Sequence, residues 1–170
     1  VLVGHDGGSE TYVKNKVMEF VGPGVASLSA DCRNGIDCMT TETTCLSSIW
    51  ETDGVTEGYL AGHGRADAYK ELKPADVAYY DGCIELDLSK IECMIALPMH
   101  PSYAYPIREL KANAKDLLHE IETRANEQLS GKVKMDLVSK VRADGSIYVD
   151  QGIVAGCSGG TYENICAVAD

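Results

Sequence analysis

One helix is the segment of this chain that the sequence defines most strongly. Between Pro106 and Gly131, apolar side chains recur at intervals of three and four residues, the spacing of one face of an α-helix. These side chains are Ile107, Leu110, Ala114, Leu117, Leu118, Ile121 and Ala125. Proline is tolerated in the first helical turn, and glycine commonly follows the last one. We therefore expect a long amphipathic helix here, and other elements must cover its apolar face.

Strand-like patterns lie on both sides of this helix. Two segments are short and apolar, one alternates apolar and polar side chains, and two later ones flank an Asp-Gly turn at residues 143–146. The segments are residues 16–21, 45–50, 83–88, 133–141 and 147–155. We expect the last two to form a hairpin.

Short helices are predicted between these strands. Asp53 is a suitable N-cap for a helix over residues 54–62, and Thr161 is a suitable N-cap for one over residues 162–170. The other short helices are predicted over residues 24–32 and 65–72. Because strands and helices alternate along the chain, the predicted fold class is α/β.

Three prolines around residue 100 predict a boundary in the chain. Residues 1–100 are expected to form the rear part of one α/β/α unit, residues 101–131 a connecting helix, and residues 132–170 the start of a second, incomplete α/β unit. Residues 5–10 are predicted to form a glycine-rich loop. The chain begins with Val1, not with Met, and we expect it to be a piece of a larger protein.

The charge of the chain limits its partners. Its 170 residues carry a formal net charge of −11, which repels phosphate backbones and anionic lipid. No apolar run approaches the roughly 20 residues needed to span a bilayer. We therefore expect neither a nucleic-acid partner nor a membrane.

The seven cysteines indicate a reducing compartment. Their odd number and irregular spacing argue against a secreted disulfide framework, so we expect the protein in the cytoplasm. Cys45, Cys83, Cys93 and Cys166 are predicted to be small buried hydrophobes. A zinc-binding module built on Cys32, Cys38 and Cys45 is an alternative, although no second pair or histidine completes it.

Several motifs, taken in order, resemble the aconitase family. The main ones are MEFVGPGV at residues 18–25, MTTE at residues 39–42 and GCSGGTYEN at residues 156–164. Further stretches that fit the family pattern are residues 48–50, 59–60, 64–67, 84–89 and 101–106. The resemblance implies part of a three-layer α/β/α iron–sulfur domain. It also implies a hydro-lyase that dehydrates and rehydrates a hydroxy-carboxylic acid at a four-iron four-sulfur cluster.

Cys157 is the candidate metal ligand. It enters a glycine-rich turn at a predicted helix start, where backbone N–H groups favour a thiolate, the form that binds metal. By resemblance, this cysteine is one of three that hold the cluster, and the other two lie in a C-x-x-C motif that these 170 residues lack. A structural cysteine is the alternative. A phosphate-binding loop is disfavoured because no Lys follows the glycines.

Glu42 is the candidate catalytic acid–base residue. Dehydration needs a proton delivered to a leaving hydroxyl group. Glu42 lies among four threonines, which are expected to hold its carboxylate by hydrogen bonds. By resemblance, the matching Glu lies near the open iron of the cluster. The alternative is a solvated surface Glu.

Two further residues are candidates for substrate binding. Cys38 stands where the citrate-cycle enzymes of the family carry an amide, and a thiol is a poor partner for a carboxylate, which argues against citrate or isocitrate. Arg33 is suited to bind a carboxylate, and a salt bridge to Asp31 or Asp37 is the alternative. Gly159 also departs from the family, which usually has Asn there.

Without the second cysteine motif, this chain is expected to bind no cluster alone and to be inactive in isolation. Its partners would be a small hydroxy-carboxylic acid and the remaining domains of the parent protein, with some self-association through uncovered apolar surface. The alternative is a non-catalytic scaffold or interaction domain that keeps the fold without the chemistry, an interpretation favoured by the departures at Cys38 and Gly159.

Overall fold

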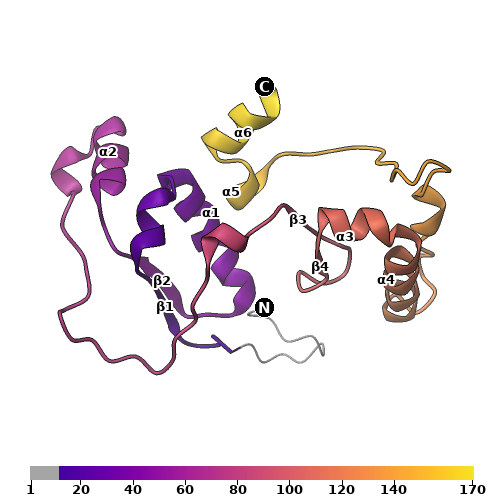
Figure 1. Cartoon of the computed structure of the whole chain (residues 1–170), viewed down its shortest axis with the longest axis horizontal. Helices are drawn as coiled ribbons and strands as arrows, with labels where there is room; N and C mark the ends of the chain where they lie inside the picture. Colours follow the sequence, from indigo (N-terminus) through magenta and orange to yellow (C-terminus); the bar gives the residue numbers. More distant parts are fainter. Residues whose placement is uncertain (1–11) are drawn as a thin grey trace. The chain divides into compact units, whose positions relative to one another are not determined.

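The computed structural model describes residues 12–170, which form two compact units (Figure 1). Unit A comprises residues 12–88 together with residues 153–170, and unit B comprises residues 89–152. The predicted loop at residues 5–10 lies outside the described residues. None of the helices within residues 12–170 has the length and apolar character needed to cross a membrane.

A β–α–β element forms the centre of unit A. Strands β1 (Val17–Phe20) and β2 (Ser47–Trp50) pair in parallel, with Val17 opposite Ser47. Parallel neighbours need a crossover connection, and helix α1 (Ala30–Thr40) supplies it. The aromatic rings of Phe20 and Trp50, which are partners across the strands, stack with centroids 4.2 Å apart. Both predicted strands are confirmed.

The connection from β1 to α1 differs from the single helix predicted over residues 24–32. A 3₁₀ turn, η1 (Pro23–Ser27), comes first, and the extended backbone of Leu28 ends it. Ser29 then caps α1, because its hydroxyl accepts a hydrogen bond from the backbone N–H of Cys32. A second 3₁₀ turn, η2 (Thr41–Thr43), follows α1 directly.

The helix predicted after Asp53 is confirmed. The Asp53 carboxylate accepts hydrogen bonds from two backbone N–H groups at the start of α2 (Gly54–Gly62). The helix predicted over residues 65–72 shrinks to a 3₁₀ turn, η3 (Ala66–Ala68). Residues 83–88 do not form the predicted strand, since no described segment pairs with them and alternation alone supplies no backbone hydrogen bonds.

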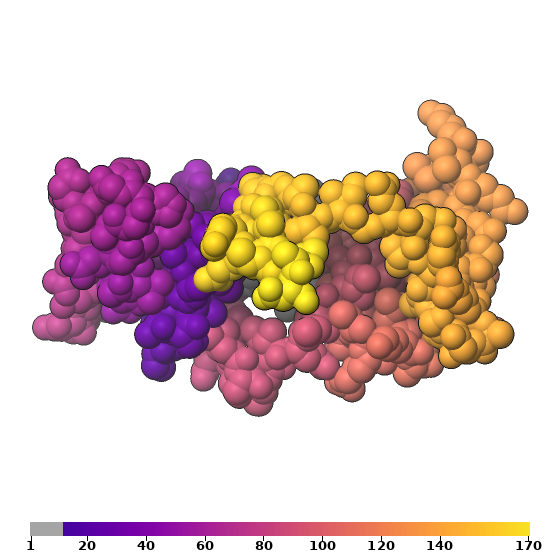
Figure 2. Space-filling view, turned by 90° about the horizontal axis from the view of Figure 1, so that it is seen from above, coloured from indigo at the N-terminus to yellow at the C-terminus, as the bar shows by residue number. Residues whose placement is uncertain are grey.

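The C-terminal segment of unit A packs against α1. It contains the one-turn helix α5 (Gly156–Gly159), within a stretch predicted to be a loop, and helix α6 (Tyr162–Ala169). Helix α5 contacts α1, and the yellow C-terminal atoms lie against the indigo-to-purple ones in Figure 2. Thr161 occupies the predicted N-cap position of α6, but its side chain makes no capping bond. Asp31 instead accepts a hydrogen bond from the backbone N–H of Glu163.

Unit B contains the long helix predicted first. Strands β3 (Met94–Ala96) and β4 (Ala104–Pro106) form an antiparallel pair that leads into α3 (Ile107–Ala112) and α4 (Ala114–Gln128). The predicted helix is broken at Asn113, whose φ of −125° is not helical. Most of its apolar face is buried as expected, around a core of Leu97, Leu110, Leu118 and Ile121, whereas Ile107 at its start is exposed.

Residues 133–155 do not form the predicted hairpin strands. The turn itself exists, because Asp144 accepts hydrogen bonds from the N–H and hydroxyl of Ser146. The residues on its two sides form only one isolated antiparallel β-bridge, between Val141 and Ile147. A 3₁₀ turn, η5 (Val138–Lys140), lies within the first predicted strand. The Glu122 carboxylate of α4 accepts hydrogen bonds from the backbone N–H groups of Leu137 and Val138 at its start. This tertiary capping replaces strand pairing.

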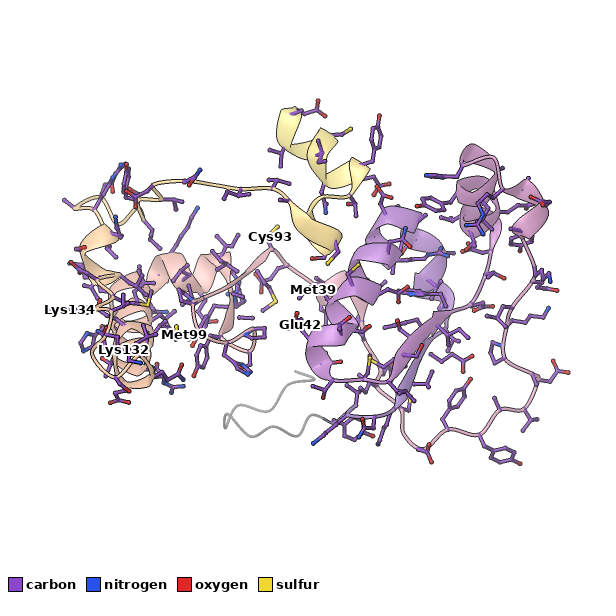
Figure 3. All side chains as sticks on the ribbon, turned by 180° about the vertical axis from the view of Figure 1, so that it is seen from behind. Met39, Glu42, Cys93, Met99, Lys132 and Lys134 are labelled. Atoms are coloured by element: carbon purple, nitrogen blue, oxygen red, sulfur yellow. The ribbon has the colours of Figure 1, made fainter. Side chains whose placement is uncertain are left out.

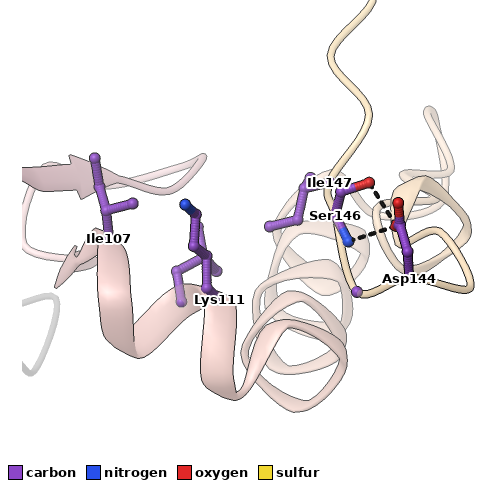
Figure 4. Close-up of a pocket in the computed structure, with 7 residues that line it drawn as sticks. Ile107, Lys111, Asp144, Ser146 and Ile147 are labelled. Atoms are coloured by element: carbon purple, nitrogen blue, oxygen red, sulfur yellow. Dashed lines mark hydrogen bonds between the residues drawn. The ribbon is translucent and has the colours of Figure 1, made fainter.

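The turn also borders an open hollow of about 520 Å³ in unit B. Ile107 and Lys111 of α3 lie on one side, and the Asp144–Ser146 turn lies on the other (Figure 4). The polar side chains that line the hollow are Lys111, Asp144 and Ser146. The structure as a whole is mixed α/β, in agreement with the predicted class.

Candidate functional site

Cys157 lies in the tight turn that starts α5. Its side chain is exposed. Ala155, just before this turn, is extended but belongs to no strand, so the strand predicted over residues 147–155 does not lead into the turn. Gly156 bends the chain there with a φ of +85°, a conformation that L side chains rarely adopt. A Cβ atom at Gly160 would lie 2.7 Å from the Gly156 carbonyl oxygen, so the turn closes tightly on itself.

Cys38, on α1, faces this turn. Its thiol donates a hydrogen bond to the backbone carbonyl oxygen of Cys157, with 3.5 Å between sulfur and oxygen. Partial burial, the neighbouring Cys157 thiol and the Asp37 carboxylate all raise the pKa of Cys38 above its ordinary value. The structure thus brings together two predicted site residues that are 119 positions apart in the sequence.

The end of α1 that carries Cys38 is fixed to the sheet. One carboxylate oxygen of Asp37 accepts hydrogen bonds from the Ser48 hydroxyl at 2.6 Å and from the Trp50 indole N–H at 2.7 Å. Both donors lie on β2. These bonds attach the C-terminal part of α1 to β2. They therefore fix the position of Cys38, the next residue on α1, relative to the sheet.

Glu42 lies one helical turn beyond Cys38, in η2, and its side chain is exposed. Residues four apart in a helix lie on the same side. Figure 3 shows Met39 and Glu42 projecting from the same edge of this helix end. The threonines around Glu42 do not hold its carboxylate as expected: the hydroxyls of Thr40 and Thr43 donate to backbone carbonyl groups instead.

Arg33 does not serve the expected role in binding a substrate carboxylate. Its side chain is only 5% exposed, and its two terminal nitrogens donate to the two oxygens of Asp53 at 2.9 and 2.7 Å. The remaining N–H groups donate to the carbonyl oxygens of Leu28 and Val25 and to the Thr56 hydroxyl. With all five donors used, none remains for a ligand. The alternative of a salt bridge to Asp31 or Asp37 is wrong in its partner, because Arg33 pairs with Asp53.

A groove of about 340 Å³ runs between α1 and the C-terminal segment. On the α1 side it is lined by Cys32 and Met39, and on the opposite side by Ser158 and Asn164. Ser158 and Asn164 belong to the GCSGGTYEN motif, which is the sequence signal for this groove. Glu163, which also lines the groove, accepts a hydrogen bond from the Ser29 hydroxyl at 2.5 Å.

No group of three metal-binding side chains forms within residues 12–170. The Cys45 thiol donates to the Thr40 carbonyl oxygen, so the alternative zinc site on Cys32, Cys38 and Cys45 does not assemble. Cys83, Cys93 and Cys166 are exposed, and the prediction that they are buried hydrophobes is wrong. For an iron–sulfur cluster, the exposed thiol of Cys157 is suitable as one ligand, and the other ligands are not assembled here.

The class of protein follows from comparison with known families. The family described as "Aconitase family (aconitate hydratase)" matches residues 6–170, which is nearly the whole chain. The chain belongs to the aconitase family.

Known relatives agree with this membership. The 2,3-dimethylmalate dehydratase large subunit of Eubacterium barkeri is 28% identical over 153 residues, covering 90% of this chain and 28% of the relative. The 3-isopropylmalate dehydratase large subunit 2 of Rubrobacter xylanophilus is 31% identical over 105 residues, covering 62% and 24%. The large subunit 1 of the same enzyme from Pyrococcus furiosus is 37% identical over 101 residues, covering 59% and 24%. The chain therefore spans about a quarter of the length of these relatives.

Proposed function

We propose that this chain is part of an aconitase-family hydro-lyase, which dehydrates and rehydrates a hydroxy-carboxylic acid at a four-iron four-sulfur cluster. Membership of the family supports this proposal, as do relatives named as dehydratases of alkyl-substituted malates. The observation that carries it is the approach of the exposed Cys157 turn to the end of α1, which bears Cys38 and is followed directly by Glu42 in η2.

In this proposal, Cys157 holds one iron of the cluster through its thiolate. The bound cluster would act as a Lewis acid toward the substrate hydroxyl group. The backbone around Cys157 supports the ligand role, because Gly156 and Gly160 present the thiol at the surface of a tight turn.

Glu42 would transfer the proton. Its carboxylate makes no hydrogen bond or ion pair with the described residues, so it is available to a ligand at the end of α1. In its protonated form, a carboxyl group can donate a proton to a departing hydroxyl group, and in its ionised form it can remove one from water. Dehydration requires the first of these proton transfers, and rehydration requires the second.

Cys38 would face the substrate. A thiol is a weak hydrogen-bond donor and behaves largely as a small hydrophobe. It is better suited to contact an alkyl substituent than a carboxylate. This favours a substrate of the alkyl-malate type named in the relatives over citrate.

The remaining cluster ligands and domains would come from further polypeptide. Parallel sheets are normally covered on both faces, whereas β1 and β2 form a two-stranded pair with Val17 and Ile49 exposed. We propose that further polypeptide completes the three-layer α/β/α arrangement and that the 170 residues alone are inactive. The seven free thiols favour the cytoplasm as the compartment.

The experiment is anaerobic cluster reconstitution, followed by a hydratase assay with alkyl-malates, on this chain and on the complete enzyme. The complete enzyme should show iron–sulfur absorbance and turnover, and Cys157→Ser should lose both. Cys166→Ser, which alters another exposed thiol, should keep them. A complete enzyme without the absorbance would overturn the mechanism, and turnover by the 170 residues alone would overturn the need for further polypeptide.

The second candidate function is a non-catalytic scaffold, favoured by the replacement of family-typical amides at Cys38 and Gly159. A Cys157→Ser protein that assembles its cluster normally would support it.

A further inference from the structure

The packing of α5 on α1 creates a pair of neighbouring thiols. The Cys38 sulfur lies 3.5 Å from the backbone carbonyl oxygen of Cys157, and the two side chains also interact with each other. Cys157 is exposed and Cys38 is partly exposed, so a small solute can reach this pair. A disulfide requires two cysteines whose backbones lie close together, and this contact provides that proximity.

Other contacts hold the two segments together independently of the thiols. The Ser29 hydroxyl donates to the Glu163 carboxylate, and Asp31 accepts from the Glu163 backbone N–H at 2.9 Å. A Cβ atom at Gly35 would lie 3.4 Å from the Ser158 carbonyl oxygen, which shows how closely the two backbones approach. The effective concentration of each thiol near the other is therefore high.

We propose that Cys38 and Cys157 form a disulfide when the metal-free chain meets a hydroperoxide. With hydrogen peroxide, the Cys157 sulfur attacks one peroxide oxygen and the O–O bond breaks. The displaced hydroxide takes up the thiol proton and departs as water, and Cys157 becomes a sulfenic acid. The Cys38 sulfur then attacks the Cys157 sulfur, the S–O bond breaks, and a second water leaves. With hydrogen peroxide, two thiols give one disulfide and two waters, and the two electrons lost by the sulfurs reduce the peroxide.

The other cysteines of unit A are less suited to this reaction. The Cys45 thiol donates to the Thr40 carbonyl oxygen, and Cys166 lies on α6 beside Tyr162. Cys32 precedes Cys38 by six residues on α1 and lines the groove. The fold therefore favours Cys38 over these cysteines, because the Cys38 thiol is the one hydrogen-bonded to the Cys157 backbone.

The disulfide would occupy the sulfur that we propose as a metal ligand. It would also cross-link α1 to α5, across a separation of 119 positions in the sequence, and so restrict the unfolded chain. The inference rests on the packing of α1 and α5 alone and goes beyond the proposed function, since it holds whether or not Cys157 binds iron.

The test uses the full 170-residue chain, prepared metal-free and reduced, then treated with hydrogen peroxide and digested with trypsin under non-reducing conditions. Mass spectrometry should find residues 34–65 linked to residues 143–170, with two fewer free thiols. The link should persist in Cys45→Ser and Cys166→Ser, which remove the other cysteine of each peptide. It should fall by more than about tenfold in Cys38→Ser and in Cys157→Ser.

Two further measurements make the result decisive. Oxidation of an equal mixture of ¹⁵N-labelled and unlabelled chains should give no mixed-isotope link, because the bond forms within one molecule. The oxidised chain should unfold at a higher temperature than the reduced chain, and this shift should be absent in Cys38→Ser. A link through Cys45 or Cys166, mixed-isotope products, or unchanged thiols after oxidation would each overturn the inference.

Discussion

The guanidinium group of Arg33 and the carboxylate of Asp53 meet in two parallel hydrogen bonds of 2.9 and 2.7 Å within unit A. This pair joins α1 to the start of α2, because Asp53 also caps α2. Arg33 is buried, whereas Asp53 retains 27% exposure of its side chain. The geometry predicts how unit A responds to mutation and to acid.

Asp53→Ala should destabilise unit A by about 3 kcal/mol, because it leaves a buried guanidinium without its counter-charge. Trp50, the only Trp of the chain, lies in unit A and reports its unfolding by fluorescence in urea. Glu71→Ala is the control, because it removes the exposed partner of Lys73 and should leave the unfolding midpoint nearly unchanged. Equal effects of the two substitutions would contradict this role of Asp53.

Unit A should lose stability in acid through the same pair. The bonds from Arg33 hold the pKa of Asp53 at about 2, below its ordinary value of 3.8. The ionised form is therefore favoured by folding, and its stabilisation is present above pH 3.8 and lost as the pH falls through 2. This corresponds to roughly 2 kcal/mol.

The measurement is the difference in unfolding free energy between wild type and Asp53→Asn as a function of pH. The difference should shrink as the pH falls from 5 toward 2. A difference that stays constant over this range would show that ionisation of Asp53 contributes nothing.

The turn that presents Cys157 should tolerate a side chain at Gly159 but not at Gly160. A Cβ atom at Gly160 would clash with the Gly156 carbonyl oxygen, whereas nothing lies within 4 Å of one at Gly159. We expect Gly160→Ala to destabilise unit A by about 1–2 kcal/mol. Gly159→Ala should be neutral or stabilise the helical turn by up to about 1 kcal/mol. The midpoints of thermal unfolding of the two variants test this expectation. A lower midpoint for Gly159→Ala than for Gly160→Ala would contradict the close approach of Gly160 to Gly156.

Glu42→Gln should lower kcat of the complete enzyme by about 10²–10⁴-fold if Glu42 transfers the proton. The amide keeps the shape of the side chain but cannot exchange a proton. Iron content and absorbance should stay normal, which separates this effect from loss of the cluster. Glu57→Gln, on the exposed side of α2, should leave kcat unchanged. A fully active Glu42→Gln enzyme would exclude the proposed role.

The 170-residue chain should self-associate through its uncovered apolar side chains. Leu46, just before β2, is 72% exposed, and Val17 on β1 is 56% exposed. In sedimentation velocity, the mean mass should rise with concentration, and Leu46→Lys should weaken this rise. A single monomeric species at the highest soluble concentration would count against the expectation.

Local sequence signals predicted several elements correctly. Asp53 marked the start of α2, and the apolar spacing marked the buried face of α3 and α4, because capping and helical periodicity involve residues only a few positions apart. The strands predicted over residues 83–88 and 133–155 failed for the opposite reason. A strand needs a hydrogen-bonded neighbour, and the alternation of side chains does not show whether one is present.

The sequence by itself determined the alternation of elements in unit A and the motifs that identify the family. Only the tertiary structure decided which side chains meet: Arg33 with Asp53, at a separation of 20 residues, and Cys38 with Cys157, at a separation of 119. The physical reason is that helices and caps are stabilised by bonds between near neighbours. The partner of a buried charge or of a thiol is set by how whole elements pack.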